Sequence, residues 1–248
     1  MTNQVNIINL KKICKIFPLE IGGEQQVLFD ISFTIQSGEF VAIMGPSGSG
    51  KSTCMNIIGA LDSATSGTYE LYGKDITTLS PDDLATIRNE YIGFVFQNFN
   101  LLPKRNILDN VMLPLMYRGI DVNDRIRRAR EMLKLVGLEN FESYLPTQLS
   151  GGMKQRVAIA RALSGNPKLI LADEPTGSLD SKMGNEILKF FKKLNTDMGI
   201  TIVIITHEFD IAQYAKRVIH IYDGRITYDG AVPKNETVLL KSQKESHK

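Results

Sequence analysis

The stretch FVAIM at residues 40–44 runs directly into GPSGSGKST at residues 45–53, and this junction decides the fold. A short, wholly apolar run that ends in a glycine-rich turn is typical of a buried parallel strand followed by a phosphate-binding loop. The spacing Gly45-x-x-x-x-Gly50-Lys51-Ser52 is that of a P-loop. A chance glycine-rich turn is the alternative, and the apolar strand in front argues against it. The sequence therefore predicts an α/β domain that binds a nucleoside triphosphate.

Each part of the predicted P-loop has a chemical task. The glycines let backbone N–H groups wrap the phosphates, and the helix expected to begin near Lys51 adds the positive end of its dipole. The Lys51 ammonium is expected to reach the β- and γ-phosphates, and the Ser52 hydroxyl to bind Mg²⁺. The residues predicted to bind nucleotide here are Gly45, Pro46, Ser47, Gly48, Ser49, Gly50, Lys51, Ser52 and Thr53.

A second phosphate-binding element is predicted at LSGGMKQR, residues 149–156. A serine and two glycines at the start of a helix leave backbone donors for an anion. The two phosphate-binding surfaces lie far apart in one chain, which suggests two copies that clamp nucleotide between them. Arg156 and Arg161 lie further along the same predicted helix, and we expect them to be packing or surface charges.

Polar side chains follow two further apolar runs. LILADE at residues 169–174 ends in Asp173 and Glu174, and His207 follows the run at residues 202–205. Open parallel sheets bind ligands at the carboxyl ends of their strands. Asp173 is predicted to hold Mg²⁺ through water and Glu174 to polarise the attacking water. An ordinary polar strand end and a structural histidine are the alternatives, and the P-loop upstream favours the functional interpretation.

Composition excludes several classes of protein. The 248 residues include 29 Lys+Arg and 27 Asp+Glu, which argues against a nucleic-acid binder held by a general positive field. Cys14 and Cys54 are too few for a disulfide framework and fit a reduced, cytoplasmic chain. No signal peptide is visible, and no apolar run approaches the roughly 20 residues that span a bilayer. Any membrane role is therefore expected to come through a partner.

Hydrophobic periodicity divides the chain into a core and an insertion. Alternating apolar residues at 27–35 predict a half-buried antiparallel strand, and residues 123–136 predict a helix that Gly137 ends. Asp223-Gly224 between two apolar runs predicts a hairpin. We predict one domain of 1–248, with an α/β core at 1–97 and 161–230, a helical subdomain at 98–160 and a polar, loosely held tail at 231–248.

Taken in order, the P-loop, Gln97, LSGGMKQR, LADEP, Ser178-Leu179-Asp180 and His207 resemble the nucleotide-binding subunit of an ABC transporter. The resemblance covers about residues 5–230. It implies an α/β P-loop NTPase core with a RecA-like parallel sheet, an N-terminal antiparallel β subdomain and an inserted helical subdomain. It also implies a soluble ATPase with ATP and Mg²⁺, in which two copies pair head to tail around two ATP molecules.

The same resemblance implies roles for further residues. Ser150, Gly151 and Gly152 would cap the γ-phosphate bound by the other copy, and Asp180 would link the two sites. Phe17 stands where a tyrosine usually stacks on adenine, and stacking does not need the hydroxyl.

Gln97 would contact Mg²⁺ and water and sense the membrane partner, and His207 would steady the γ-phosphate. The predicted catalytic residues are therefore Glu174, His207 and Gln97, and the predicted metal ligands are Ser52, Gln97 and Asp173.

The subgroup is narrowed by GFVFQNFNLLP at 93–103, NVMLPLMYRG at 110–119 and PTG at 175–177. These resemble the lipoprotein-release (LolD-like) and macrolide-efflux (MacB-like) exporters. The similarity implies a peripheral ATPase on the inner face of the cell membrane, held by a permease on a separate chain. The main alternative is an FtsE-like ATPase that signals through a membrane partner without transport.

Two further alternatives fit less well. A soluble ABC protein that acts on DNA or ribosomes usually has long coiled coils, zinc-type cysteines or two ATPase halves, none of which is visible. An unrelated P-loop kinase or GTPase leaves LSGGMKQR unexplained.

The segment after Gln97 contains three apolar residues, Phe99, Leu101 and Leu102, in an otherwise polar setting. Two interpretations stay open for them. They pack the helical subdomain onto the core, or they receive a short cytoplasmic helix of the permease in a groove that uses a few apolar anchors. On the second interpretation a charge at Leu101 abolishes complex formation and leaves the melting temperature nearly intact.

Overall fold

The computed structural model describes residues 5–19 and 22–245, and two β-sheets organise this part of the chain. The larger sheet has six strands in the order β10-β9-β3-β8-β7-β6. All neighbours run parallel except β10, which is antiparallel to β9. The bounds are β3 Phe40–Met44, β6 Ile92–Val95, β7 Leu169–Asp173, β8 Thr201–Thr206, β9 Arg217–Tyr222 and β10 Arg225–Ala231. The three strands predicted from apolar runs and the Asp223-Gly224 hairpin are confirmed.

A smaller antiparallel sheet has the order β2-β1-β4-β5. Its strands are β1 Asn6–Pro18, β2 Glu24–Gln36, β4 Ser66–Leu71 and β5 Lys74–Asp75. Along β2 the side chains of Ile31, Phe33 and Ile35 are buried while the residues between them are more exposed. The predicted antiparallel strand and its alternation from Ile31 to Ile35 are therefore confirmed. Before the left-handed Asp30 the alternation is wrong, because Leu28 is buried while Val27 and Phe29 are half-buried.

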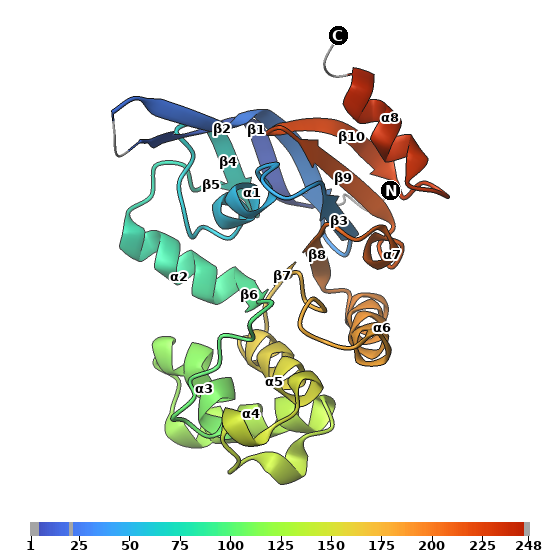
Figure 1. Cartoon of the computed structure of the whole chain (residues 1–248). Coiled ribbons are helices and arrows are strands. Elements are labelled where there is room, and N and C mark those ends of the chain that lie inside the picture. Colours follow the sequence, from blue (N-terminus) through green and yellow to red (C-terminus); the bar gives the residue numbers. More distant parts are fainter. Residues whose placement is uncertain (1–4, 20–21, 246–248) are drawn as a thin grey trace.

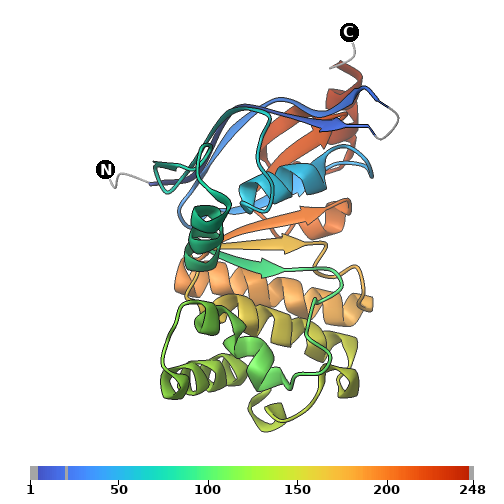
Figure 2. The same ribbon diagram turned by 90° about the vertical axis from the view of Figure 1, so that its left-hand side faces the viewer.

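The parallel sheet separates two apolar cores, because successive strand residues point to opposite faces. Val41 and Ile43 pack toward α1 (Lys51–Ile58) and the antiparallel sheet. Ala42 and Met44 belong to the other core, which α5 (Gly151–Ser164) and α6 (Ser181–Met198) cover. Figure 2 shows the strands between these layers. Because β3, β8 and β7 are parallel neighbours, the turns that follow them lie at one edge of the sheet.

The segment predicted as a helical subdomain lies at the end of the molecule opposite the antiparallel sheet (Figure 1). Here α3 (Ile107–Tyr117) and α4 (Val122–Leu135) pack on α5, and short 3-10 turns span Glu139–Phe141 and Pro146–Gln148. The helix predicted at 123–136 is confirmed as α4, and Gly137 follows it with a left-handed φ of 73°. The exact boundaries of the subdomain stay a prediction. The remaining helices are α2 Pro81–Tyr91, α7 Phe209–Ala212 and α8 Thr237–Glu245.

The C-terminal tail differs from the expectation of a loosely held segment. Its residues form α8, which packs on β10, and Leu239 is 1% exposed and belongs to the same core as α5 and α6. Leu239 is the buried anchor of the helix, while its apolar neighbours Val238 and Leu240 are 42% and 47% exposed. Because that anchor depends on a contact with β10, the local composition gives no sign of it. Residues 246–248 of the predicted tail lie outside the described residues.

Candidate nucleotide-binding site

The P-loop follows β3, and two of its glycines combine a positive φ with a close neighbour. Gly45 has a φ of 153°, and a Cβ there would lie 2.0 Å from the carbonyl oxygen of Ile221. Gly50 has a φ of 97°, and a Cβ there would lie 2.8 Å from Cδ2 of Leu28. Only glycine tolerates both the conformation and the contact. The loop is therefore held in one closely packed conformation against its neighbouring strands.

Two polar side chains of the loop are buried. Lys51 is 7% exposed, and its Nζ donates a 2.7 Å hydrogen bond to the carbonyl oxygen of Pro46. Burial lowers the pKa of Lys51, while the charges of Glu174 and Asp173 raise it. Ser49 is 2% exposed, and its hydroxyl has no hydrogen-bond partner in the part of the chain that the structure describes. A buried ammonium and a buried, unsatisfied hydroxyl are groups that a bound phosphate would satisfy.

The other side chains of the loop face outward to different degrees. Pro46, Ser47, Gly48 and Ser52 are exposed, and Thr53 is half-buried. The Ser52 hydroxyl, at the second position of α1, is thus open to a ligand on the same surface as the loop.

Asp173 and Glu174 lie at the carboxyl end of β7. Burial and the charge of Glu174 raise the pKa of Asp173, and the Lys51 ammonium lowers it. Glu174 has a left-handed φ of 40°, and its N–H donates to the carbonyl oxygen of Ile205 at 2.9 Å. Its Oε1 lies 2.7 Å from Nδ1 of His207, the residue after β8. Left-handed backbone at a non-glycine residue needs such support and gathers at functional sites.

Gln97 borders the turn that carries Glu174. A Cβ on Gly177 would lie 2.8 Å from Nε2 of Gln97. The Ser178 hydroxyl donates to the backbone oxygen of Gln97 at 3.1 Å, and the Gly177 N–H donates to the backbone oxygen of Glu174 at 3.0 Å. The structure therefore pairs the predicted residues Glu174 and His207 and places Gln97 against the turn that follows Glu174.

Ser150 and Asp180 each cap the start of a helix. The Ser150 hydroxyl accepts a 3.3 Å hydrogen bond from the Met153 N–H, and the Asp180 carboxylate accepts one of 2.9 Å from the Met183 N–H. A Cβ on Gly152 would lie 2.5 Å from Met183, so the two helix starts touch. Ser150 and Asp180 are exposed and Gly151 is half-buried. Because α5 and α1 cover opposite faces of the sheet, Ser150 and the P-loop do not form one compact pocket.

Phe17 lies near the end of β1 and is 37% exposed. The ammonium of Lys15 sits 4.8 Å from the centre of its ring, and the same ammonium donates to Asp62 at 2.7 Å. A cation over one face of the ring is a favourable contact. The predicted stacking residue is thus a surface aromatic that Lys15 holds in place.

Two arginines that we expected to be packing or surface charges bind backbone oxygens. Arg161, on α5, donates to the carbonyl oxygens of Phe99 and Asn100, which both have left-handed φ angles of 60° and 48°. Burial lowers the pKa of Arg161 to about 10. Arg156 donates to the carbonyl oxygen of Val136 at 3.2 Å. Arg161 therefore fixes the backbone just after Gln97, a role that helical periodicity alone does not reveal.

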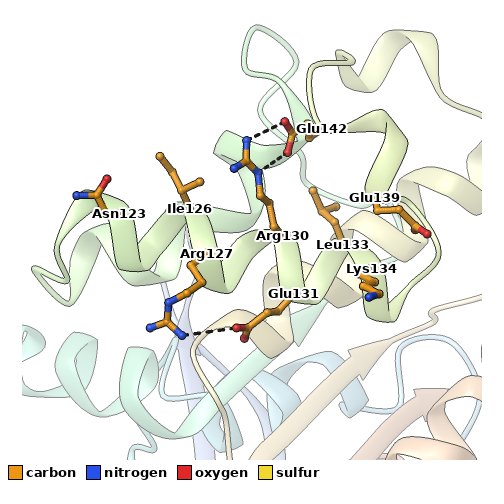
Figure 3. A pocket seen from close by; sticks show the side chains of 9 residues that line it. All are labelled: Asn123, Ile126, Arg127, Arg130, Glu131, Leu133, Lys134, Glu139 and Glu142. Carbon is orange, nitrogen blue, oxygen red and sulfur yellow. Dashed lines mark hydrogen bonds and ion pairs between the residues drawn. The ribbon is translucent and has the colours of Figure 1, made fainter.

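Two hollows are lined by none of the residues predicted to bind nucleotide or metal or to catalyse hydrolysis. One, of about 650 Å³, runs along the outer face of α4 (Figure 3), where Arg130 pairs with Glu142 and Arg127 with Glu131. These pairs occupy four of its charged side chains, and no predicted site residue lines it. The second is a groove of about 1040 Å³ between α2, β6 and α3, lined by Phe94, Phe96, Leu113, Pro114, Tyr117, Arg118 and Arg161 among others.

Residues 28–177 match the family model described as ABC transporter. The chain belongs to this family. It is 50% identical over 225 residues to the macrolide export ATP-binding/permease protein MacB of Syntrophobacter fumaroxidans, covering 90% of the chain and 31% of that protein. It is 52% identical over 225 residues to the uncharacterized ABC transporter ATP-binding protein YvrO of Bacillus subtilis, covering 90% and 96%. The predicted membership of the MacB-like group is confirmed, and the chain spans about one third of MacB.

Solved structures agree with the fold. MJ0796, a bacterial ABC transporter cassette, has a dimeric structure in a post-hydrolysis state bound to ADP and Pi. It superposes with a TM-score of 0.83 at 44% identity, covering 92% of this chain and all of that one. The predicted fold class, an α/β cassette of the ABC transporter family, is therefore confirmed.

Proposed function

We propose that the chain is the ATP-hydrolysing subunit of a membrane exporter of the lipoprotein-release or macrolide-efflux type. The observation that carries the proposal is the contact of 2.7 Å between Oε1 of Glu174 and Nδ1 of His207. At the same edge of the sheet, the negative charges of Glu174 and Asp173 interact with the Lys51 ammonium and raise its pKa. A carboxylate beside a phosphate-binding lysine is placed to activate water. The relatives named for macrolide export support the transport class.

The site suits ATP and Mg²⁺ on its own chemistry. The unsatisfied Ser49 hydroxyl and the Lys51 ammonium supply donors to phosphate oxygens. Ser52, Gln97 and Asp173 supply the oxygen ligands that Mg²⁺ prefers, and the bound ion would neutralise charge on the phosphates. The exposed ring of Phe17 would stack on adenine.

The chain's own residues then divide the hydrolytic work. The Lys51 ammonium leaves the Pro46 oxygen and binds phosphate oxygens instead. Glu174 accepts a hydrogen bond from the attacking water and orients it toward the γ-phosphate. His207 fixes the carboxylate through Nδ1 and supports the γ-phosphate.

A second copy of the chain completes each site. Ser150 is exposed at the start of α5, on the face of the sheet opposite α1, and its helix start is suited to an anion. A head-to-tail dimer would bring Ser150, Gly151 and Gly152 of one copy to the P-loop of the other. The dimeric structures of MJ0796 support the formation of a dimer.

Complementation between inactive variants tests the composite site. A Ser150→Arg chain and a Lys51→Ala chain are each expected to be inactive alone, since each damages both sites of its homodimer. Mixing them creates a heterodimer with one intact composite site, so part of the ATPase activity is expected to return, measured as phosphate release against the mixing ratio.

The control for this experiment is Lys154→Ala, a change on the same helix at a residue with no assigned role, which should stay active alone. Full activity of purified Ser150→Arg chains would contradict the composite site. If size-exclusion chromatography shows the heterodimer but no phosphate is released, the two sites are obligately coupled.

The membrane part of the proposal rests on what this chain shares with MacB. No helix within residues 5–19 and 22–245 is long and apolar enough to cross a bilayer. The match covers about one third of a protein whose name joins an ATP-binding part to a permease. We therefore place the chain on the inner face of the cell membrane, bound to a permease. Co-purification from native cells, followed by identification of the membrane partner, tests this and separates an exporter from an FtsE-like signalling subunit.

The groove between α2, β6 and α3 is the proposed docking site for a short cytoplasmic helix of the permease. Phe94 and Phe96 stack in its wall with ring centres 5.5 Å apart, and Tyr117 is 82% exposed at its rim. Arg118 and Arg161 contribute positive charge and bind backbone oxygens. A groove-held helix needs a few apolar anchors of this kind, and the cations favour an acidic residue on it.

The positions of Phe99, Leu101 and Leu102 favour one of the two interpretations that the sequence leaves open. Leu101 is half-buried and packs against the core that α5 shares, so a charge there is expected to lower the melting temperature. Phe99 is half-buried, with its ring about 4 Å from the position of a Cβ on Gly151. Leu102 is 43% exposed and lies outside the groove lining. Packing of the subdomain is thus the better interpretation for Phe99 and Leu101.

The revised docking prediction uses Tyr117→Glu. Placing a charge among the apolar residues of the groove is expected to lower recovery of the permease in a pull-down by at least about tenfold, with basal ATPase activity and melting temperature nearly unchanged. Met116→Glu is the matched control, because Met116 is 49% exposed beside Tyr117 but does not line the groove. If Tyr117→Glu recovers the permease at the wild-type level, the docking site does not lie in this groove.

A further inference from the structure

The amide of Gln155 is buried in α5 and reaches across to the turn that carries Glu174. Gln155 is 0% exposed, and its Nε2 donates a 2.6 Å hydrogen bond to the backbone oxygen of Pro175. Pro175 directly follows Glu174. The bond thus joins two segments twenty residues apart, one carrying Ser150 and the other carrying the carboxylate.

Other contacts of α5 with this segment lie further along the turn, where Gly151 packs against Leu179 and Gly152 against Met183. The Glu174 N–H is held by β8, through the oxygen of Ile205, and the Gly177 N–H closes the turn onto the Glu174 oxygen. A Cβ on Gly177 would meet the Gln97 amide. The hydrogen bond from Gln155 meets the turn at Pro175, directly beside the left-handed backbone at Glu174, and it gives a movement of α5 a direct route to that residue.

The way this amide is satisfied argues against a purely stabilising role. Within the described residues, Oε1 of Gln155 and Oγ1 of Thr176, next to Pro175, are both buried without a hydrogen-bond partner. A buried polar group that is only partly satisfied costs stability. An apolar side chain of similar length would fill this position without that cost, although it would leave the Pro175 oxygen unbonded.

We infer that Gln155 is a positioning residue that couples the Ser150 end of α5 to the orientation of Glu174. This rests on the proposed function, in which Ser150 contacts the nucleotide of the second copy while Glu174 serves the nucleotide of its own P-loop. Engagement of one nucleotide then shifts α5, and Gln155 carries the shift to the carboxylate of the other site. Small displacements of a reacting group change rates strongly.

The test compares Gln155→Met with Asn195→Leu. Methionine keeps the length of glutamine and removes the donor, so kcat for ATP is expected to fall at least about tenfold, with the ATP dissociation constant within about threefold of wild type. Asn195 is a matched buried amide, 6% exposed, that donates to the oxygens of Gly38 and Ile200 at the opposite edge of the sheet. Asn195→Leu is expected to lower the melting temperature and leave kcat per folded molecule unchanged.

Gln155→Glu supplies a second readout that simple destabilisation would not give. A protonated carboxyl can donate to the Pro175 oxygen and a carboxylate cannot, and burial raises the pKa of a carboxyl. The kcat of this variant, relative to wild type, is therefore expected to rise as pH falls. This variant also serves if Gln155→Met does not fold.

Three outcomes are distinguishable. The positioning role is overturned if Glu174→Gln is inactive and folded Gln155→Met has a kcat within twofold of wild type. It is also overturned if the pH profile of kcat for Gln155→Glu runs parallel to that of wild type. Full activity of Glu174→Gln in the same assay overturns the proposed function itself. A low kcat in Gln155→Met, with Asn195→Leu unimpaired, supports the inference.

Discussion

Replacing Glu174 by glutamine is expected to lower the turnover of ATP by about 10²–10⁴-fold. Glutamine keeps the shape of the side chain and its contact of 2.7 Å with Nδ1 of His207, but it removes the basic oxygen that orients water. The backbone at Glu174, with its left-handed φ of 40°, keeps its hydrogen bond to Ile205. The measurement is steady-state phosphate release at saturating ATP, beside a calorimetric titration with ATP.

Binding and chemistry separate clearly in this experiment. ATP affinity is expected to stay within about threefold of wild type, because the P-loop donors are untouched. Glu208→Gln is the matched control, since Glu208 is an exposed carboxylate beside His207 and has no assigned role. Unchanged hydrolysis in Glu174→Gln would require another group to activate water.

The parallel core was predictable because its signals are local. The runs at 40–44, 169–172 and 202–205 are apolar throughout, which only a strand buried on both faces requires. Residues of the candidate site follow each run. Because the carboxyl ends of parallel strands share one edge of the sheet, Lys51, Glu174 and His207 are expected there. The strand order therefore predicts that Glu174 and His207 lie near each other, and the structure adds the distance of 2.7 Å between them.

Other features depend on contacts between distant segments, and the sequence does not reveal them. The anchoring of α8 depends on one leucine, Leu239, meeting the core beside β10. Arg161 and Gln155 have ordinary helical spacing, but their polar groups bind backbone oxygens 61 and 20 residues away. Leu101 looks like its exposed neighbour Leu102 in sequence, and only the packing of α5 separates them.

The structure also adds a physical account of the P-loop that motif spacing lacks. Motif spacing identifies the glycines, whereas the Cβ positions explain which ones are irreplaceable. Gly45 lies against the backbone of Ile221 and Gly50 against the side chain of Leu28. Gly48 has open space around it, but its left-handed φ of 79° still favours glycine. Substitution by alanine at Gly45 is thus far more disruptive than the same change at an exposed turn.

Replacing Lys51 by alanine is expected to weaken ATP binding by at least about 10²-fold while changing the melting temperature by only a few degrees. Within the described residues the Lys51 ammonium makes one hydrogen bond, to the Pro46 oxygen, and burial lowers its pKa because the charged form loses hydration. Removing it therefore removes a bond and a desolvation cost together, and these oppose each other. With ATP bound, the same ammonium would face phosphate oxygens, where its loss has no compensation.

Calorimetric titration with ATP beside a thermal melt separates these effects. Lys192→Ala, which removes a positive charge from the exposed face of α6, is the control and should alter neither quantity. Wild-type affinity together with a lowered melting temperature in Lys51→Ala would make Lys51 a structural residue. Loss of ATP affinity at an unchanged melting temperature would show that the Lys51 ammonium serves ligand binding and is not needed for the fold. Its burial fits this role, because the charges of Asp173 and Glu174 only partly offset the cost of desolvating the ammonium.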